Sequence, residues 1–250
     1  MVIMKVGVIG GTGFYEMRGD EIEVETPYGA VILFYLDEGD REIFFLPRHG
    51  KKHVPAHMVN YRANIAAMKK AGVEAIVAIN TVGSMRREFE IGSFFIPDDF
   101  IDFTCRKSTF FDKEAVHIDM SQPFCPIVRK ILIEEAMKKG KVNEGVYVVT
   151  EGPRLETKAE INMLKNFAHV VGMTLSPEVI LAREAGICYA SICIISNYAA
   201  GMQEKLDVEE IRRVYEERKG DLMDVVKEAL KKIPENRNCG CKYAAERGKL

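Results

Sequence analysis

The sequence predicts a single α/β domain with a mixed, largely parallel central sheet flanked by helices. Short apolar runs rich in β-branched residues alternate with stretches of helical periodicity along almost all of the 250 residues. No proline-rich or serine-rich linker interrupts this alternation, and no segment is repeated. This order favours one domain over residues 1–234, followed by a tail of residues 235–250.

Turn and cap residues mark the ends of the expected elements. The first strand, residues 2–9, runs into a glycine cluster, and a helix at residues 59–71 stops at Gly72. Another helix should be capped by Ser176, with Pro177 in its first turn and Gly186 at its end. The other strands are expected at residues 21–26, 30–36, 42–46, 74–80, 93–103, 145–150, 170–173 and 188–196, and the other helices at residues 126–139, 157–167 and 208–232.

Composition and charge argue against several classes of protein. The 35 Lys and Arg against 37 Asp and Glu leave a formal charge of -2 without a polybasic segment, which disfavours a nucleic-acid partner. The longest apolar run, residues 187–195, is far shorter than the roughly 20 residues of a membrane helix. The amino-terminal residues lack the apolar core of a signal peptide, so a cytoplasmic protein without a membrane partner is expected. In that reducing compartment four cysteines should be buried apolar thiols: Cys105, Cys125, Cys188 and Cys193.

Polar residues follow several predicted strands, at the edge where open α/β sheets bind ligands. Residues 10–13 form a glycine turn in which Thr12 adds a hydroxyl donor; a tight turn without a ligand is the alternative. After a later strand, Arg48 can hold two phosphate oxygens with its planar guanidinium, and His49 supplies another donor. Similar polar turns are expected at residues 80–84, 151–157, 172–174 and 196–201. Their convergence predicts an anion-binding cavity.

A metal site is the alternative at the second of these positions. His49, His53 and His57 are spaced four residues apart, as ligands on one helix face would be. Pro55 breaks the helix that would align them, and no acidic or cysteine cluster follows. We therefore expect anion binding there, and no metal.

The motifs at these strand ends resemble those of the trimeric purine nucleoside phosphorylases, in particular the branch that contains methylthioadenosine phosphorylase. The likeness extends from the first strand to the helix near residue 232. Its most specific segments are residues 48–50 (Arg-His-Gly), 59–64 (Val-Asn-Tyr-Arg-Ala-Asn), 151–154 (Glu-Gly-Pro-Arg), 173–174 (Met-Thr) and 177–178 (Pro-Glu). The resemblance implies the nucleoside phosphorylase fold, a homotrimer or dimer of trimers, inorganic phosphate as co-substrate, and no metal or organic cofactor.

The resemblance also implies roles for individual residues. The implied phosphate site consists of Thr12, Arg48, His49, Thr81 and Thr174. The residues implied to contact the nucleoside include Asn80, Val82, Gly83, Met173, Tyr198, Ala199, His53, Val208 and Ile211. His117 resembles a histidine that a neighbouring subunit lends to the 5′ end of the nucleoside, so an oligomer would be needed for a complete site.

Two residues depart from the pattern of the phosphorylases that take 6-aminopurines. Those enzymes have serine at the position of Glu156, and Asp-Tyr-Asp at residues 197–199, where this chain has Asn-Tyr-Ala. A glutamate accepts a hydrogen bond from N1–H of hypoxanthine or guanine, whereas adenine has no proton there, and the Asn197 amide can donate or accept along the O6/N7 edge. Glu156, Asn197 and His49 are therefore the expected catalytic residues. In the alternative, Glu156 is only an acid at a helix start beside Thr157.

The expected activity is phosphorolysis of inosine or guanosine to the free base and ribose 1-phosphate, a step of purine salvage. Within the same class, 5′-methylthioinosine or methylthioadenosine is the alternative substrate, although Arg212 replaces a usually apolar residue near the 5′ pocket. A nucleoside hydrolase or a non-catalytic nucleotide-binding module would be a different class. The hydrolase would need a carboxylate or calcium to activate water, and no Asp cluster near the first strand supplies it.

The tail carries a Cys-Gly-Cys sequence at residues 239–241. Cys239 and Cys241 could form a local disulfide, supply half of a metal site, or remain as two exposed thiols. Zinc is disfavoured because no second cysteine pair or nearby histidine pair completes four ligands. Similar tails in heat-adapted members of the family favour a stabilising disulfide without a catalytic role.

Overall fold

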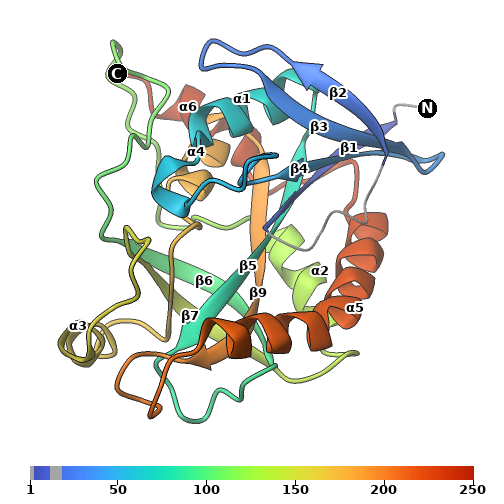
Figure 1. Cartoon of the computed structure of the whole chain (residues 1–250). Helices are drawn as coiled ribbons and strands as arrows, with labels where there is room; N and C mark the ends of the chain where they lie inside the picture. Colours follow the sequence, from blue (N-terminus) through green and yellow to red (C-terminus); the bar gives the residue numbers. More distant parts are fainter. Residues whose placement is uncertain (1–2, 12–18) are drawn as a thin grey trace.

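The computed structural model describes residues 3–11 and 19–250, which form one α/β domain (Figure 1). Its mixed sheet has the strand order β2-β3-β4-β1-β5-β8-β7-β6-β9, which confirms the expected fold class. The strands are β1 (Met4–Gly10), β2 (Asp20–Val24), β3 (Val31–Asp37), β4 (Arg41–Pro47), β5 (Ala75–Ser84), β6 (Phe94–Asp102), β7 (Val142–Val149), β8 (Val170–Gly172) and β9 (Cys188–Tyr198). The α-helices are α1 (Tyr61–Lys70), α2 (Pro126–Ala136), α3 (Lys158–Leu164), α4 (Glu178–Glu184), α5 (Val208–Lys232) and α6 (Ala244–Arg247).

Part of the sheet closes on itself. Strand β9 pairs in parallel with β5 and also in antiparallel fashion with β6, so β5, β8, β7, β6 and β9 form a ring. Strands β1 and β4 extend the sheet parallel to β5, and β2 and β3 complete it as antiparallel strands. Because β4, β1, β5 and β9 all run in the same direction, their carboxyl ends meet at one edge.

Helices cover both faces of the sheet, with α2 and α5 on one side and α1 and α4 on the other (Figure 1). Successive side chains of β5 therefore enter different cores: Val77 packs in the core with α2 and α5, whereas Ile76 packs in the core with α1 and α4. A strand buried on both faces has a continuous apolar sequence instead of an alternating one, as β5 and β9 do.

Two strands are longer than the sequence predicts. Residues 80–84 and 196–198, expected as turns after strands, belong to β5 and β9 themselves. The two strands pair along this whole length, so the backbone hydrogen bonds of these polar residues continue in the sheet, with a register shift between Val82 and Gly83. The polar side chains still lie at the carboxyl end, but they are held by a rigid ladder and not by a turn.

Three further local expectations are wrong. Ser176 does not cap α4: its buried hydroxyl donates to the Asp102 carboxylate, and Pro177 occupies the cap position without a side-chain cap. Cys105 is exposed, in contrast to Cys125, Cys188 and Cys193, which are buried as expected. The favoured disulfide between Cys239 and Cys241 is not formed; both are free thiols, and with Cys241 buried and Cys239 half-buried the alternative of two exposed thiols does not hold either.

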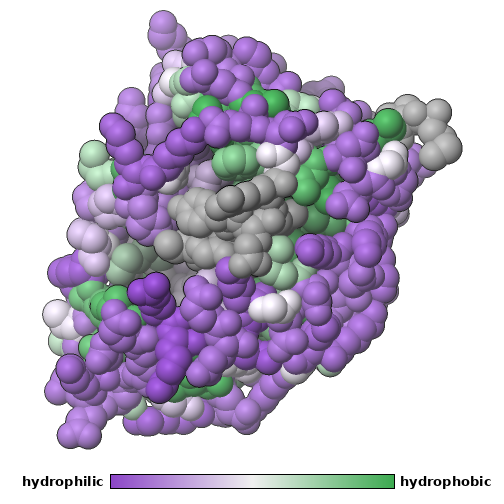
Figure 2. Space-filling view, turned by 45° about the vertical axis from the view of Figure 1, so that its right-hand side comes forward, coloured by the Kyte–Doolittle hydropathy of each residue, from purple (hydrophilic) through white to green (hydrophobic). Residues whose placement is uncertain are grey.

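The face in Figure 2 is predominantly hydrophilic, with apolar residues in small separate patches. Among residues 3–11 and 19–250, no helix combines the length and the apolar composition needed to span a bilayer.

Candidate active site

A cavity of about 790 Å³ opens at the carboxyl edge where β4, β5 and β9 end, and the first turns of α5 form one of its walls. Most of the residues proposed from the sequence line it: Arg48, His49, Asn80, Thr81, Val82, Gly83, Glu156, Met173, Thr174, Asn197, Ala199, Val208 and Ile211. Gly11, at the end of β1, also lines the cavity, whereas Thr12 lies outside the described residues. The rule that ligands bind at the carboxyl ends of parallel strands therefore located the cavity.

Three of the proposed contact residues do not line this cavity. Tyr198 is directed away, and its hydroxyl donates to the Arg87 carbonyl at 3.2 Å. His53 is exposed, with its ring centroid 5.1 Å from that of His49. His117 lies on the surface, where its backbone N–H donates to the Gly248 carbonyl. Among the described residues, no cluster of potential metal ligands includes a histidine.

Arg48 is buried in an ion pair that the sequence did not reveal. Its Nε and one terminal nitrogen donate to the two carboxylate oxygens of Glu178 at 2.8 and 2.9 Å, and its other terminal nitrogen donates to the Ile79 carbonyl at 2.9 Å. Burial opposes the charge of Arg48, but the adjacent Glu178 carboxylate outweighs it and raises the pKa of the guanidinium. Tyr189 donates a further hydrogen bond to Glu178 at 2.7 Å.

This pairing corrects the expected role of Arg48. The planar fork that was assigned to two phosphate oxygens holds Glu178 instead. Of the five guanidinium N–H groups, three are engaged, which leaves two for an anion in the cavity. An anion bound there would meet a cation that is already neutralised and fixed in position.

His49 is uncharged at neutral pH. Burial, followed by the charge of Arg48, lowers the pKa of its imidazole from 6.5 to about 4. Its Nδ1 lies 2.8 Å from the Val54 carbonyl, which selects the tautomer that carries the proton on Nδ1. The Nε2 lone pair is then an acceptor, so neutral His49 can accept a hydrogen bond from a protonated phosphate oxygen. It does not supply the additional donor that the sequence suggested.

A chain of hydrogen bonds orients the polar residues between Arg48 and the rest of the cavity. The Asn80 amide donates to the Ser191 hydroxyl at 2.7 Å and accepts from the Thr174 hydroxyl at 2.6 Å. Because Ser191 lies on β9 and Thr174 follows β8, this chain joins three strands of the closed ring. It fixes the Thr174 hydroxyl and makes its oxygen available as an acceptor.

Glu156 and Asn197 are both held by neighbours while they face the cavity. The Thr150 hydroxyl donates to Glu156 at 2.6 Å. The Asn197 carbonyl oxygen accepts from Ser196 at 2.7 Å, and its amide nitrogen donates to the Tyr198 carbonyl at 2.9 Å. The Asn197 amide therefore keeps one N–H and one oxygen lone pair for a ligand, and the Glu156 carboxylate keeps acceptor positions only.

The acid in the first turn of α3 is Glu160 and not Glu156. Thr157 caps α3, and the acid that completes the capping box is Glu160. Glu160 also forms an ion pair with Arg154, leaving Glu156 in the loop before the cap with its carboxylate in the cavity. No helix-dipole role is needed for it.

The wall formed by α5 is mostly apolar but carries two charges. Leu206, Val208 and Ile211 supply the apolar part, and Arg212 and Glu216 lie among them. Sequence reasoning found Val208, Ile211 and Arg212 but missed Leu206 and Glu216. Since Glu216 follows Arg212 by one helical turn, the periodicity of α5 could have revealed it.

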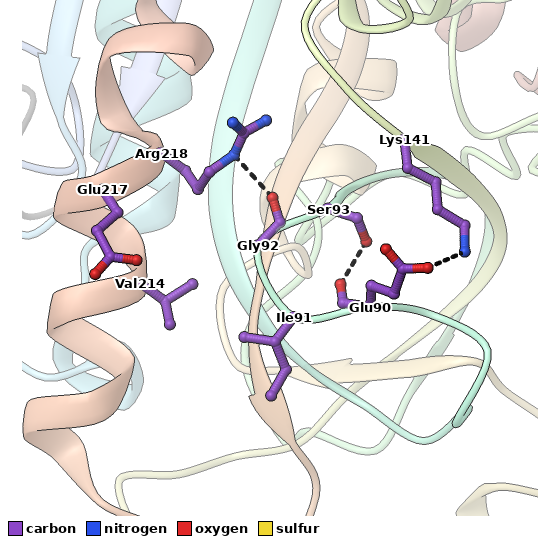
Figure 3. Close-up of a pocket in the computed structure, with 8 residues that line it drawn as sticks. All are labelled: Glu90, Ile91, Gly92, Ser93, Lys141, Val214, Glu217 and Arg218. Atoms are coloured by element: carbon purple, nitrogen blue, oxygen red, sulfur yellow. Dashed lines mark hydrogen bonds and ion pairs between the residues drawn. The ribbon is translucent and has the colours of Figure 1, made fainter.

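A second, smaller pocket of about 330 Å³ lies between α5 and the turn at residues 90–93 (Figure 3). Its charged groups already have partners: Arg218 donates to the Gly92 carbonyl at 2.9 Å, and Lys141 pairs with Glu90 at 2.9 Å. The larger cavity is therefore the candidate active site.

Comparison with known proteins agrees with this geometry. A family model described as the phosphorylase superfamily matches residues 5–231. The chain is 44% identical to a protein of Methanosarcina acetivorans named probable S-methyl-5′-thioinosine phosphorylase, over 98% of this chain and 96% of that protein. It is 46% identical to the S-methyl-5′-thioadenosine phosphorylase of Pyrococcus horikoshii, over 95% of this chain and 96% of that protein.

A solved structure is similar over the whole fold. It is a mutant adenosine/methylthioadenosine phosphorylase of Schistosoma mansoni in complex with methylthioadenosine, with a TM-score of 0.91, 32% identity and 99% coverage of both chains. The relatives' names favour methylthio nucleosides over the inosine and guanosine expected from the sequence. With its fold, its cavity and its sequence in agreement, the chain belongs to the phosphorylase superfamily, as a nucleoside phosphorylase.

Proposed function

We propose that the protein cleaves 5′-methylthioinosine with inorganic phosphate, giving hypoxanthine and 5-methylthioribose 1-phosphate. The observation that carries this proposal is the pairing of Glu156 and Asn197 in a cavity whose α5 wall is apolar. It combines the 6-oxopurine preference expected from the sequence with the methylthio substrates in the relatives' names. No metal or organic cofactor is part of the proposal.

Glu156 and Asn197 support the choice of a 6-oxopurine base. The Thr150 hydroxyl holds the Glu156 carboxylate, which then accepts from the N1–H of hypoxanthine. Adenine presents a lone pair at N1, so the half-buried Glu156 carboxylate would repel it and leave one oxygen without a donor, at a cost of about 1–3 kcal/mol. The free N–H of Asn197 donates to the O6/N7 edge and stabilises negative charge as the base leaves.

The α5 wall supports a methylthio group at the 5′ position. Leu206, Val208 and Ile211 offer apolar contact to a thioether, whereas a 5′-hydroxyl against the same surface would lose hydrogen bonds to water. One buried methyl-sized group contributes about 1 kcal/mol to such a preference.

The polar end of the cavity positions phosphate for attack on the anomeric carbon. Two N–H groups of Arg48 donate to the anion, and the Thr174 oxygen and neutral His49 accept from its protonated oxygens, which replaces part of the entropic cost of a bimolecular encounter. Because Glu178 already balances Arg48, the charge of the phosphate stays available to stabilise the cationic ribosyl group in the transition state.

A homotrimer or dimer of trimers belongs to the proposal. His117 is on the surface and outside the cavity of its own chain, which leaves it accessible for the role that the resemblance implies, at the 5′ end of a neighbouring subunit's site.

Inosine is the second candidate substrate, because Arg212 and Glu216 give the α5 wall two polar groups that a 5′-hydroxyl could use. Steady-state kinetics on three nucleosides, with and without phosphate, separate the candidates. Methylthioinosine against inosine tests the 5′ wall, and methylthioinosine against methylthioadenosine tests the base. We expect methylthioinosine to have the highest kcat/KM, and turnover to require phosphate. A higher kcat/KM for methylthioadenosine would overturn the assignment of Glu156.

A further inference from the structure

Four cysteines from three distant parts of the chain meet at one point. The Sγ atoms of Cys125, Cys188, Cys239 and Cys241 all lie within 4.8 Å of one another, and those of Cys188 and Cys239 are 3.4 Å apart. Among the described residues, these four make up the only cluster of three or more potential metal ligands. Three of the cysteines are buried and Cys239 is half-buried.

We propose that these four cysteines bind one zinc ion that fastens the carboxy-terminal tail to the domain. A tetrahedral zinc with Zn–S bonds of about 2.3 Å places its sulfurs about 3.8 Å from one another. The observed spacing therefore needs adjustments of an ångström or less to enclose the ion. Four sulfur ligands with no open position are typical of a structural zinc site and not of a catalytic one.

The backbone around the cluster brings the sulfurs together. Cys125 immediately precedes α2, at the N-cap position of the helix. Cys188 is the first residue of β9. Gly240, at φ 73°, allows the sharp turn that directs both tail cysteines to the same point.

Positively charged side chains surround the cluster. Arg183 of α4 donates to the Cys241 sulfur at 3.3 Å, and Arg237 lies beside Cys188 while its guanidinium pairs with Glu74 at 2.9 Å. A zinc ion with four thiolates carries two negative charges, and Arg183 offsets part of them through a hydrogen bond to a sulfur, as is typical of the surroundings of metal ligands.

The site is separate from the active-site cavity. Cys188 and Asn197 are at opposite ends of β9, about 30 Å apart at roughly 3.3 Å per residue. The proposal thus does not rest on the proposed function. The argument against zinc from the sequence was wrong in its premise, because it sought a second pair near the tail, and Cys188 lies 51 residues before Cys239.

The test is the metal content and thiol state of the full chain, expressed with zinc and purified anaerobically without chelator or reductant. We expect about one zinc per chain after dialysis. Cys239→Ser and Cys241→Ser should each retain at most roughly one tenth of the wild-type zinc. The control Cys105→Ser, which changes an exposed cysteine outside the cluster, should retain all of it. Metal-free wild-type protein, prepared with a mercurial and a chelator and then reduced, should bind one Co²⁺ and show the visible absorption of tetrahedral thiolate coordination.

The Co²⁺ titration uses unmodified protein, so it decides the question even if the serine variants fold poorly. Wild-type protein with no zinc, and with an intact mass lower by four hydrogen atoms, would replace the metal site by two disulfides and overturn the proposal. Reduced wild-type protein that binds neither ion would overturn it as well. Phosphorolysis at moderate temperature should persist without metal, which keeps this test distinct from that of the proposed function.

Discussion

Replacing Glu178 by glutamine tests the arrangement of charge at the phosphate end of the cavity. Glu178 is fully buried, and its carboxylate accepts two hydrogen bonds from Arg48 and one from Tyr189. Glutamine keeps the size but directs an amide N–H₂ at one Arg48 donor and leaves the buried cation unbalanced. Breaking such a pair costs about 3–5 kcal/mol. At about 2–4 °C per kcal/mol for a chain of this length, the melting temperature should fall by roughly 10 °C.

The matched control is Glu184→Gln on the same helix. Glu184 is also buried, at 8% exposure, but its carboxylate accepts from the Phe110 backbone N–H, which a glutamine oxygen can still satisfy. The free energy of unfolding of Glu184→Gln should therefore be lower than that of wild type by only about 1 kcal/mol. Calorimetry with and without phosphate measures both variants, and phosphate should raise the melting temperature of Glu178→Gln more than that of wild type, because it supplies the missing negative charge. An equal fall in melting temperature for the two variants would refute this account of Arg48. So would a difference in melting temperature between Glu178→Gln and wild type that phosphate leaves unchanged.

Three other variants test the remaining parts of the site. Burial, followed by the charge of Arg48, lowers the pKa of His49 to about 4 in the folded protein. As the pH falls below 6.5, the imidazole is therefore protonated first in the unfolded chain. The free energy of unfolding that this residue contributes above pH 6.5 is lost as the pH approaches 4. Between pH 6.5 and 4.5 this amounts to roughly 2 kcal/mol, which denaturant unfolding should show for wild type and not for His49→Gln. The double variant Glu156→Ser with Asn197→Asp should shift the ratio of kcat/KM for methylthioadenosine over methylthioinosine by roughly 100-fold or more, and an unchanged ratio would remove these residues from base selection. In Gly83→Ala the new Cβ would lie 3.2 Å from the Asn197 amide nitrogen, so kcat/KM for the nucleoside should fall several-fold while the KM for phosphate stays constant; an equal rise in the phosphate KM would contradict the placement of Gly83 beside the base.

The parts of the fold that depend on local sequence were predictable. Gly72 and Gly186 end their helices at positive φ, and the long helix α5 spans the expected residues. The ring of strands was not predictable, because β9 closes it by pairing with β5 and β6, and periodicity within one strand says nothing about its neighbours. That closure is also why residues 80–84 are strand and not turn.

The candidate site shows the same division. Polar residues at strand ends were found because parallel strands deliver them to one edge. Partners from distant segments were missed: Glu178 lies 130 residues from Arg48, and Cys188 lies 51 residues from Cys239. For this reason the prediction that Arg48 holds two phosphate oxygens with its planar guanidinium was wrong. Nothing near Arg48 in the sequence indicates that a buried carboxylate already occupies that guanidinium.

Competition in a single reaction tests the central claim most directly. Wild-type protein would receive equal concentrations of 5′-methylthioinosine and 5′-methylthioadenosine with inorganic phosphate, and the bases and sugar products would be quantified together. We expect hypoxanthine to be released ahead of adenine, in equimolar amount with 5-methylthioribose 1-phosphate, and no release when phosphate is omitted. Preferential release of adenine, or formation of free 5-methylthioribose without phosphate, would contradict the account.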